Sequence, residues 1–301
     1  MNTNRTLFSA GADAVRRNLR YLVWFYLFSL LFAWVGATGF GMHAHSIMDH
    51  SLYSDKLLHG FHIAVLVELL NRPEFGPTES STAPAIVFAV SFLWLNLTFM
   101  PGVLLGYSSD HRISRGEFFR ACGRNLWRFV RLFILAAIVT GVVGGILIAG
   151  RDALVKAAEA TNYERLPFAI RLSGLFITLM ALNMVRAWFD VAQTDVVLSD
   201  QKAVRKSLAS AFGSVKRNFG KLFVAYIGIA FMGLVVLICG IVLWNLIVPS
   251  ASVAGAFIIS QVITLLLLAM RFWQRAAAVA FYLQQKAEPA MEAMAVTPVV
   301  A

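Results

Sequence analysis

Apolar side chains gather in six long runs along this chain. The runs cover about residues 21–42, 84–107, 129–149, 168–189, 222–248 and 253–274. About 20 residues of α-helix cross the hydrocarbon core of a bilayer, and a helix satisfies its own backbone hydrogen bonds there. The pattern therefore predicts an all-α, polytopic membrane helix bundle with about six transmembrane helices.

A further apolar run, 63–70, is too short to cross a bilayer. Apolar side chains recur around it at helical spacing, at Leu58, Phe61, Val65, Leu66 and Leu69. This spacing predicts an amphipathic helix that lies on the membrane or packs against the bundle.

Composition agrees with a membrane protein. Of the 301 residues, 59% are hydrophobic and only 14% are charged, whereas a soluble domain carries about 25% charged residues. The net charge of +10 comes from basic residues beside the apolar runs, where the positive-inside rule places them, so we expect no nucleic-acid partner.

Lys and Arg define an orientation. They concentrate before the first run and in the loops 108–128 and 190–221, whereas the loops 43–83, 150–167 and 249–252 are acidic, mixed or uncharged. Cytoplasmic loops carry the excess of Lys and Arg. We therefore expect a multi-pass protein of a bacterial inner membrane with both termini in the cytoplasm, and a first run that is retained as a span.

The sequence also repeats internally. Residues 109–133 align without gaps on 199–223 with eight identities, and Val15-Arg16-Arg17-Asn18-Leu19 resembles Val215-Lys216-Arg217-Asn218-Phe219. Arg186 and Trp188 correspond to Arg271 and Trp273. The alignment predicts one membrane domain, 1–286, made of three parallel hairpin repeats at about 5–107, 109–198 and 199–286, followed by a disordered tail at 287–301. Each repeat would begin with a basic amphipathic cytoplasmic helix, capped in two repeats by Ser109-Asp110 and Ser199-Asp200.

The basic-aromatic segment that leads into each span, as in Val215-Lys216-Arg217-Asn218-Phe219, together with the six-span layout, resembles a broad group of bacterial multi-pass inner-membrane proteins. The group consists mostly of uncharacterised proteins and includes the membrane domain attached to some glycerophosphodiester phosphodiesterases. The resemblance implies the fold but no catalysis, since the chain has no room for a phosphodiesterase domain.

Two groups of charged residues are candidate sites. The first is a basic stripe on one helix face, Arg120, Arg124, Arg128 and Arg131. It would contact anionic phospholipids at the bilayer surface, or simply anchor the span that follows.

The second group lies at the cytoplasmic ends of two spans, where burying charge is costly. It comprises Arg186, Asp190, Arg271 and Arg275. These residues would snorkel to the headgroups, join two repeats in a structural cluster, or form a transport site. We expect Asp190 to contact an arginine of the fourth or sixth span while the other arginines reach lipid phosphates, and Asp195 to be solvated.

Catalytic chemistry has little support in the sequence. Histidines gather in one outside segment, at His43, His45, His50, His59 and His62, but without a recognised metal motif. We expect no catalytic residue, metal or cofactor.

The most favoured function is a non-enzymatic membrane protein that scaffolds or modulates membrane components, ahead of a small-solute or lipid transporter or channel and of a membrane-embedded enzyme. A transporter should gather polar groups at mid-membrane, and an enzyme should gather titratable groups at one surface.

Overall fold

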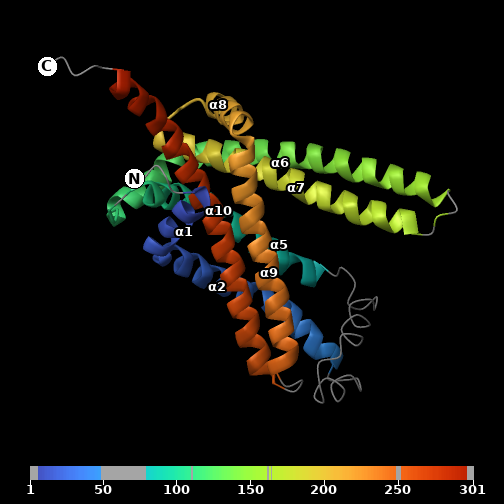
Figure 1. The fold of residues 1–301 in the computed structure, drawn as a ribbon. Helices are drawn as coiled ribbons and strands as arrows, with labels where there is room; N and C mark the ends of the chain where they lie inside the picture. The colour runs from blue at the N-terminus through green and yellow to red at the C-terminus, as the bar shows by residue number, and fades with distance from the viewer. Residues whose placement is uncertain are drawn as a thin grey trace. The chain divides into compact units, whose positions relative to one another are not determined.

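The computed structural model describes residues 6–48, 79–109, 111–160, 163, 165–248 and 252–296. This part of the chain forms eight α-helices and no strand (Figure 1). The helices are α1 (Leu7–Arg17), α2 (Leu19–Met48), α5 (Glu79–Ser108), α6 (Arg115–Glu159), α7 (Arg165–Leu198), α8 (Val204–Arg217), α9 (Phe219–Ile247) and α10 (Val253–Val296).

Long apolar helices dominate the fold. Five are long and apolar enough to cross a membrane, and the number rises to six if α1 and α2, which are interrupted at Asn18, count as one span. The predicted all-α class is thereby confirmed, and the helices are those of a multi-pass membrane protein. The predicted amphipathic segment at 58–69 lies outside the described residues, as do His50, His59 and His62.

Two helices extend well beyond the predicted spans. α6 has 45 residues and joins the basic segment to the span without a break. α10 has 44 residues and continues to Val296. The segment 287–296, expected to be a disordered tail, is therefore helical, because its alanines, methionines and glutamates favour a helix once one has begun.

The chain separates into two compact units, each made of several segments. The first comprises residues up to Asn18, 97–231 and from Arg271 onward, and the second comprises 19–96 and 232–270. Within the second unit α9 and α10 approach closely, since a Cβ on Gly240 would lie 2.5 Å from the Ile263 side chain. Within the first unit α6 packs along α7, and α7 packs against α8.

The helix starts show why the expected caps are wrong. α6 begins with a capping box of Ser114 and Glu117, and α8 begins after Ala203 without a side-chain cap. The hydroxyls of Ser109 and Ser199 instead donate to Leu105 and Asp195 carbonyls of the preceding helices, at 3.0 and 2.6 Å. Asp110 lies outside the described residues.

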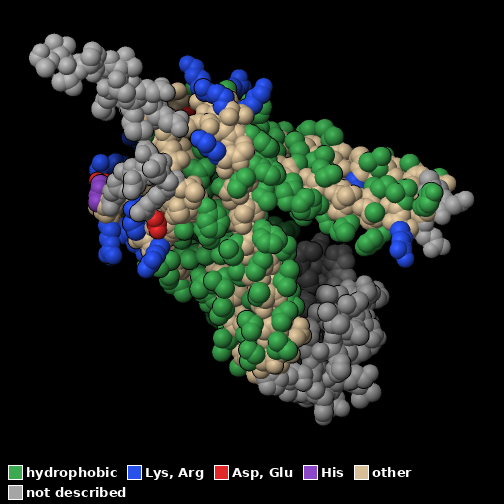
Figure 2. Space-filling view, viewed as in Figure 1, with side chains coloured by type: hydrophobic (Ala, Val, Ile, Leu, Met, Phe, Trp, Pro, Cys, Tyr) green, Lys and Arg blue, Asp and Glu red, His purple; other side chains and the backbone are tan. Residues whose placement is uncertain are grey.

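Two interruptions share one local conformation. Asn18 ends α1 with φ −121° and ψ 34°, and Asn218 ends α8 with φ −115° and ψ 31°. Each follows two basic residues and precedes a long apolar helix. Figure 2 shows hydrophobic side chains over α6 and α7, and Lys and Arg side chains gathered over α8.

Candidate functional site

Asp190 is the most deeply buried charged side chain of the candidate set. It lies on α7 with only 4% of its surface exposed. The Tyr226 hydroxyl of α9 donates to Asp190 Oδ2 at 3.0 Å, and Arg186 Nε lies 3.7 Å from the same oxygen. The expectation that Asp190 contacts an arginine of the fourth or sixth span is confirmed.

The remaining arginines come from α10. Arg275 lies within electrostatic range of Asp190 and Arg186, and its Nη1 donates to Met100 Sδ at 3.2 Å. Arg271, one turn earlier, is exposed, and among the described residues it has no carboxylate partner. The charge of Arg186 acts on it. The structure therefore groups Arg186 and Arg275 around the Asp190 carboxylate, and Arg271 lies one helical turn from Arg275 on α10, within range of Arg186.

Amide side chains surround this cluster. Gln274 Nε2 donates to the backbone carbonyl of Tyr226 at 3.2 Å and lies 3.4 Å from Asn183 Oδ1, and Asn183 Nδ2 donates to the same carbonyl. α7, α9 and α10 are thus joined by polar bonds within the first unit. Neither Tyr226 nor Gln274 was predicted to belong to the site. Gln274 offered only a polar group at the end of an apolar run, whereas Tyr226 also aligns with Tyr26 in the internal repeat.

The expectation that Asp195 is solvated is wrong. Its side chain is half-buried, and Tyr282 of α10 donates to Asp195 Oδ1 at 2.8 Å. The extension of α10 beyond the predicted span brings Tyr282 to this position. Asp190 and Asp195 therefore each bind a tyrosine, one from α9 and one from α10.

The basic stripe of α6 divides into two parts. Arg124 and Arg128 both bind Asp200, which lies between α7 and α8, and Arg128 Nη1 is 2.8 Å from Asp200 Oδ1. These guanidiniums hold the pKa of the Asp200 carboxyl well below its usual range. Arg120 and Arg131 remain exposed, and Arg131 lies over the Trp127 ring. Within the stripe, these two arginines are the ones that form no ion pair with Asp200.

Two tryptophans anchor the short basic helices. Trp188 Nε1 of α7 donates to the Leu208 carbonyl of α8 at 2.9 Å, and Trp273 Nε1 of α10 donates to the Phe8 carbonyl of α1 at 2.8 Å. The Phe8 and Trp273 rings lie 4.3 Å apart. In each case a returning span holds a short helix that precedes another span.

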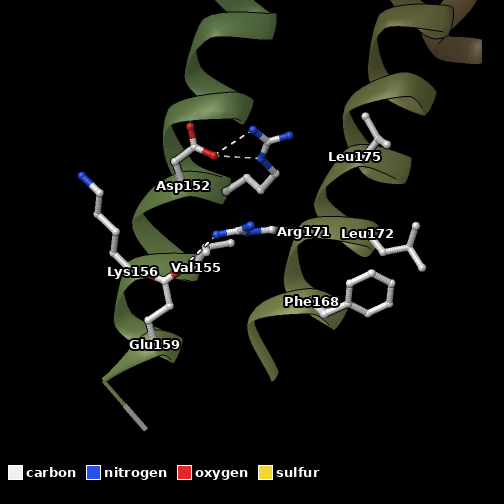
Figure 3. Close-up of a pocket in the computed structure, with 9 residues that line it drawn as sticks. Asp152, Val155, Lys156, Glu159, Phe168, Arg171, Leu172 and Leu175 are labelled. Carbon is white, nitrogen blue, oxygen red and sulfur yellow. Dashed lines mark hydrogen bonds and ion pairs between the residues drawn. The ribbon is translucent and has the colours of Figure 1, made fainter. Parts of the chain in front are cut away.

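A separate pocket of about 730 Å³ lies between the far ends of α6 and α7 (Figure 3). Four of its charged residues form ion pairs, in which Arg171 lies 2.9 Å from Glu159 and Arg151 lies 2.8 Å from Asp152, and Lys156 is a fifth charged residue of the lining. The Arg151 side chain lies against Gly174, where a Cβ would come within 2.6 Å. The pocket is therefore an amphipathic fissure whose lining combines apolar side chains with three basic and two acidic residues.

Metal-binding side chains form no group of three or more within the described part of the chain. His43 and His45 belong to α2. The buried cluster offers guanidinium, phenol and amide donors around one carboxylate, a set suited to holding helices together or to binding an anion.

Comparison of the chain with protein-family models, with curated proteins and with solved structures found no match.

Proposed function

We propose that this chain is a non-enzymatic, multi-pass inner-membrane protein that scaffolds or modulates other membrane components. The observation that carries the proposal is the use of the intramembrane polar groups. Asp190, Asn183 and Gln274 are all engaged in bonds that join α7, α9 and α10. Such bonds stabilise helix association in membranes, and a structural cluster of this kind suits a scaffold.

We further propose that the bundle consists of three parallel hairpin repeats with basic amphipathic helices on the cytoplasmic side. The matching dihedral angles at Asn18 and Asn218 support it. So do Trp188 and Trp273, which occupy aligned positions and make the same kind of bond. Tyr26 and Tyr226 also align, and each donates its hydroxyl to a polar side chain, Gln261 and Asp190 respectively.

Anionic phospholipids of the cytoplasmic leaflet are the proposed partners of the basic stripe at the start of α6. Arg120 and Arg131 are exposed on α6 and would contribute about 1 kcal/mol each near a negative surface. We also propose kinship with the bacterial membrane domains described above, on the strength of the same basic segments.

Reconstitution tests the scaffold proposal. The protein is extracted with its surrounding lipid in a polymer nanodisc, and co-purifying proteins are quantified relative to it. In parallel, purified protein in vesicles is assayed for solute efflux and for lipid scrambling. We expect a partner in fixed stoichiometry and no flux above protein-free vesicles. Flux or scrambling that Asp190→Asn abolishes would replace the scaffold by a transporter.

The transporter is the second candidate, because one observation favours it. Asp190 and Arg186 lie inside a span and are grouped with Arg275, as a transport site would require. The flux assay separates the two functions, since a purely structural cluster changes stability without moving solute.

A further inference from the structure

Two arginines bracket a short uncharged stretch of α7. Arg171 and Arg186 are separated by 15 residues, which at 1.5 Å per residue is about 22 Å. The hydrocarbon core is about 30 Å thick, so at least one of the two arginines lies below the headgroups. Arg171 belongs to the charged pocket at the far ends of α6 and α7, where it binds Glu159 (Figure 3).

The pairing of α6 with α7 places Arg186 at depth. Gly144 of α6 packs against Leu182 of α7. Because the two helices run antiparallel, Arg186 is level with about Thr140. Arg131, which is exposed at the other end of the α6 span, is nine residues away, or about 13 Å. Arg186 is therefore anchored well inside the cytoplasmic leaflet.

The charges around Arg186 do not balance. Arg186 and Arg271 contribute two positive charges, and Asp190 contributes one negative charge that Tyr226 also uses. Within the described residues no carboxylate forms an ion pair with Arg271. Excess positive charge at this depth is costly unless an anion accompanies it.

We propose that Arg186 and Arg271 form a binding site for a phosphate group, with the phosphate of an anionic phospholipid drawn in from the cytoplasmic leaflet as its source. Guanidinium groups match the oxygens of a phosphate with two parallel hydrogen bonds each. Arg186 is about one-third exposed and Arg271 is exposed, so both are accessible, whereas Arg275 stays behind them against Met100.

Arg271→Gln tests the site most cleanly, because it removes a guanidinium that has no described protein partner. Arg217→Gln is the matched control, since Arg217 is exposed on α8 outside the cluster. Native mass spectrometry of the full chain in detergent measures binding of phosphatidylglycerol, phosphatidylcholine and inorganic phosphate. We expect one tightly bound phosphatidylglycerol whose affinity falls about tenfold or more in Arg271→Gln, as for loss of a charged hydrogen bond, and not in Arg217→Gln.

The probes distinguish the sources of the phosphate. Preference for phosphatidylglycerol identifies lipid, whereas equal binding of inorganic phosphate, also lost in Arg271→Gln, retains the site but makes a free anion its ligand. Equal affinities in the wild type and Arg271→Gln, or equal losses in both variants, overturn the proposal. The inference rests on membrane insertion but not on scaffolding, so its failure would leave the co-purification result unaffected.

Discussion

Asp190 illustrates, at the scale of the residue, how a buried charge stabilises a membrane bundle. Its carboxylate holds Tyr226 at 3.0 Å and Arg186 at 3.7 Å, and only 4% of the residue is exposed. Taking such a pair out of water costs as much as the pair returns, but removing one partner strands the other. The contribution of Asp190 to stability is therefore measured best by removing its side chain.

Replacing Asp190 by Ala should destabilise the bundle by about 3 kcal/mol, because Arg186 would lose its carboxylate and Tyr226 its acceptor. Thermal unfolding in detergent measures the loss. Asp152→Ala is the control: its carboxylate is 53% exposed and binds its neighbour Arg151, so we expect less than about 1 kcal/mol. Equal losses in the two variants would show that Asp190 is an ordinary surface acid.

The ion pairs of Asp200 should make the stability of the protein depend on pH in the acid range. Arg124 and Arg128 lower the pKa of this carboxyl in the folded protein. Their contribution is therefore fully present above the ordinary pKa of about 3.9 and is lost as the pH falls through the lower, folded value. Asp200→Asn should reduce the fall in melting temperature below pH 4 without changing its slope between pH 5 and 7. An unchanged acid limb in the variant would contradict the assignment.

The backbone conformation at Asp200 also favours Asn over Ala as the replacement. Asp200 has a positive φ of 52°, a conformation that Asn tolerates and Ala does not. Asp200→Ala should therefore unfold at a lower temperature than Asp200→Asn at neutral pH, since it adds backbone strain to the same loss of ion pairs.

The sequence predicted part of this chemistry at the residue scale. Arg186 and Asp190 could be paired because they lie four residues apart on one helix. Asp200 and Arg128 are 72 residues apart, and only the packing of α6 along α7 and of α7 against α8 joins them. Asp200 was consequently expected to be a helix cap, and Asp195 to be solvated, because neither tertiary partner leaves a local signal.

At the scale of the element, the long apolar runs correctly predicted where the helices lie. The helix ends predicted from the neighbouring polar residues differ from the observed ends. Each predicted run is at least as long as a helix needs to cross a bilayer. The six runs coincide with α2, α5, α6, α7, α9 and α10. The extension of α6 is the predicted basic segment, which continues into the span without a break, and the extension of α10 begins with apolar, buried residues beyond the last predicted span. The tryptophan bonds to α1 and α8 likewise depend on tertiary contact.

Replacing each of these tryptophans by phenylalanine tests those hydrogen bonds. Trp273→Phe removes the indole N–H that donates to Phe8, and Trp188→Phe removes the one that donates to Leu208. Each should cost about 1 kcal/mol and speed amide hydrogen exchange locally, in α1 for the first variant and in α8 for the second. The two variants control for each other, and exchange that rises equally in both helices would show a general loss of stability instead.

At the scale of the whole molecule, the distribution of charge along the chain predicts the orientation in the membrane, which helix packing does not. Lys and Arg crowd the segments around α8 and the start of α6, whereas the connection between α6 and α7 is mixed. The packing of the helices does not by itself assign either end of a span to the cytoplasm. Orientation therefore remains a prediction from the positive-inside rule, and it determines which leaflet can supply a phosphate to Arg186 and Arg271.

Cysteine labelling in intact cells tests that orientation. The native cysteines are first replaced by alanine; Cys122 is buried and Cys239 is exposed on α9. Single cysteines are then placed at three exposed positions, Gly116, Ala157 and Ser210. A membrane-impermeant maleimide should label Ala157→Cys from outside, and Gly116→Cys and Ser210→Cys only after permeabilisation, because the basic segments around the last two remain in the cytoplasm. Outside labelling of Gly116→Cys with protection of Ala157→Cys would invert the molecule and would assign the phosphate site to the outer leaflet.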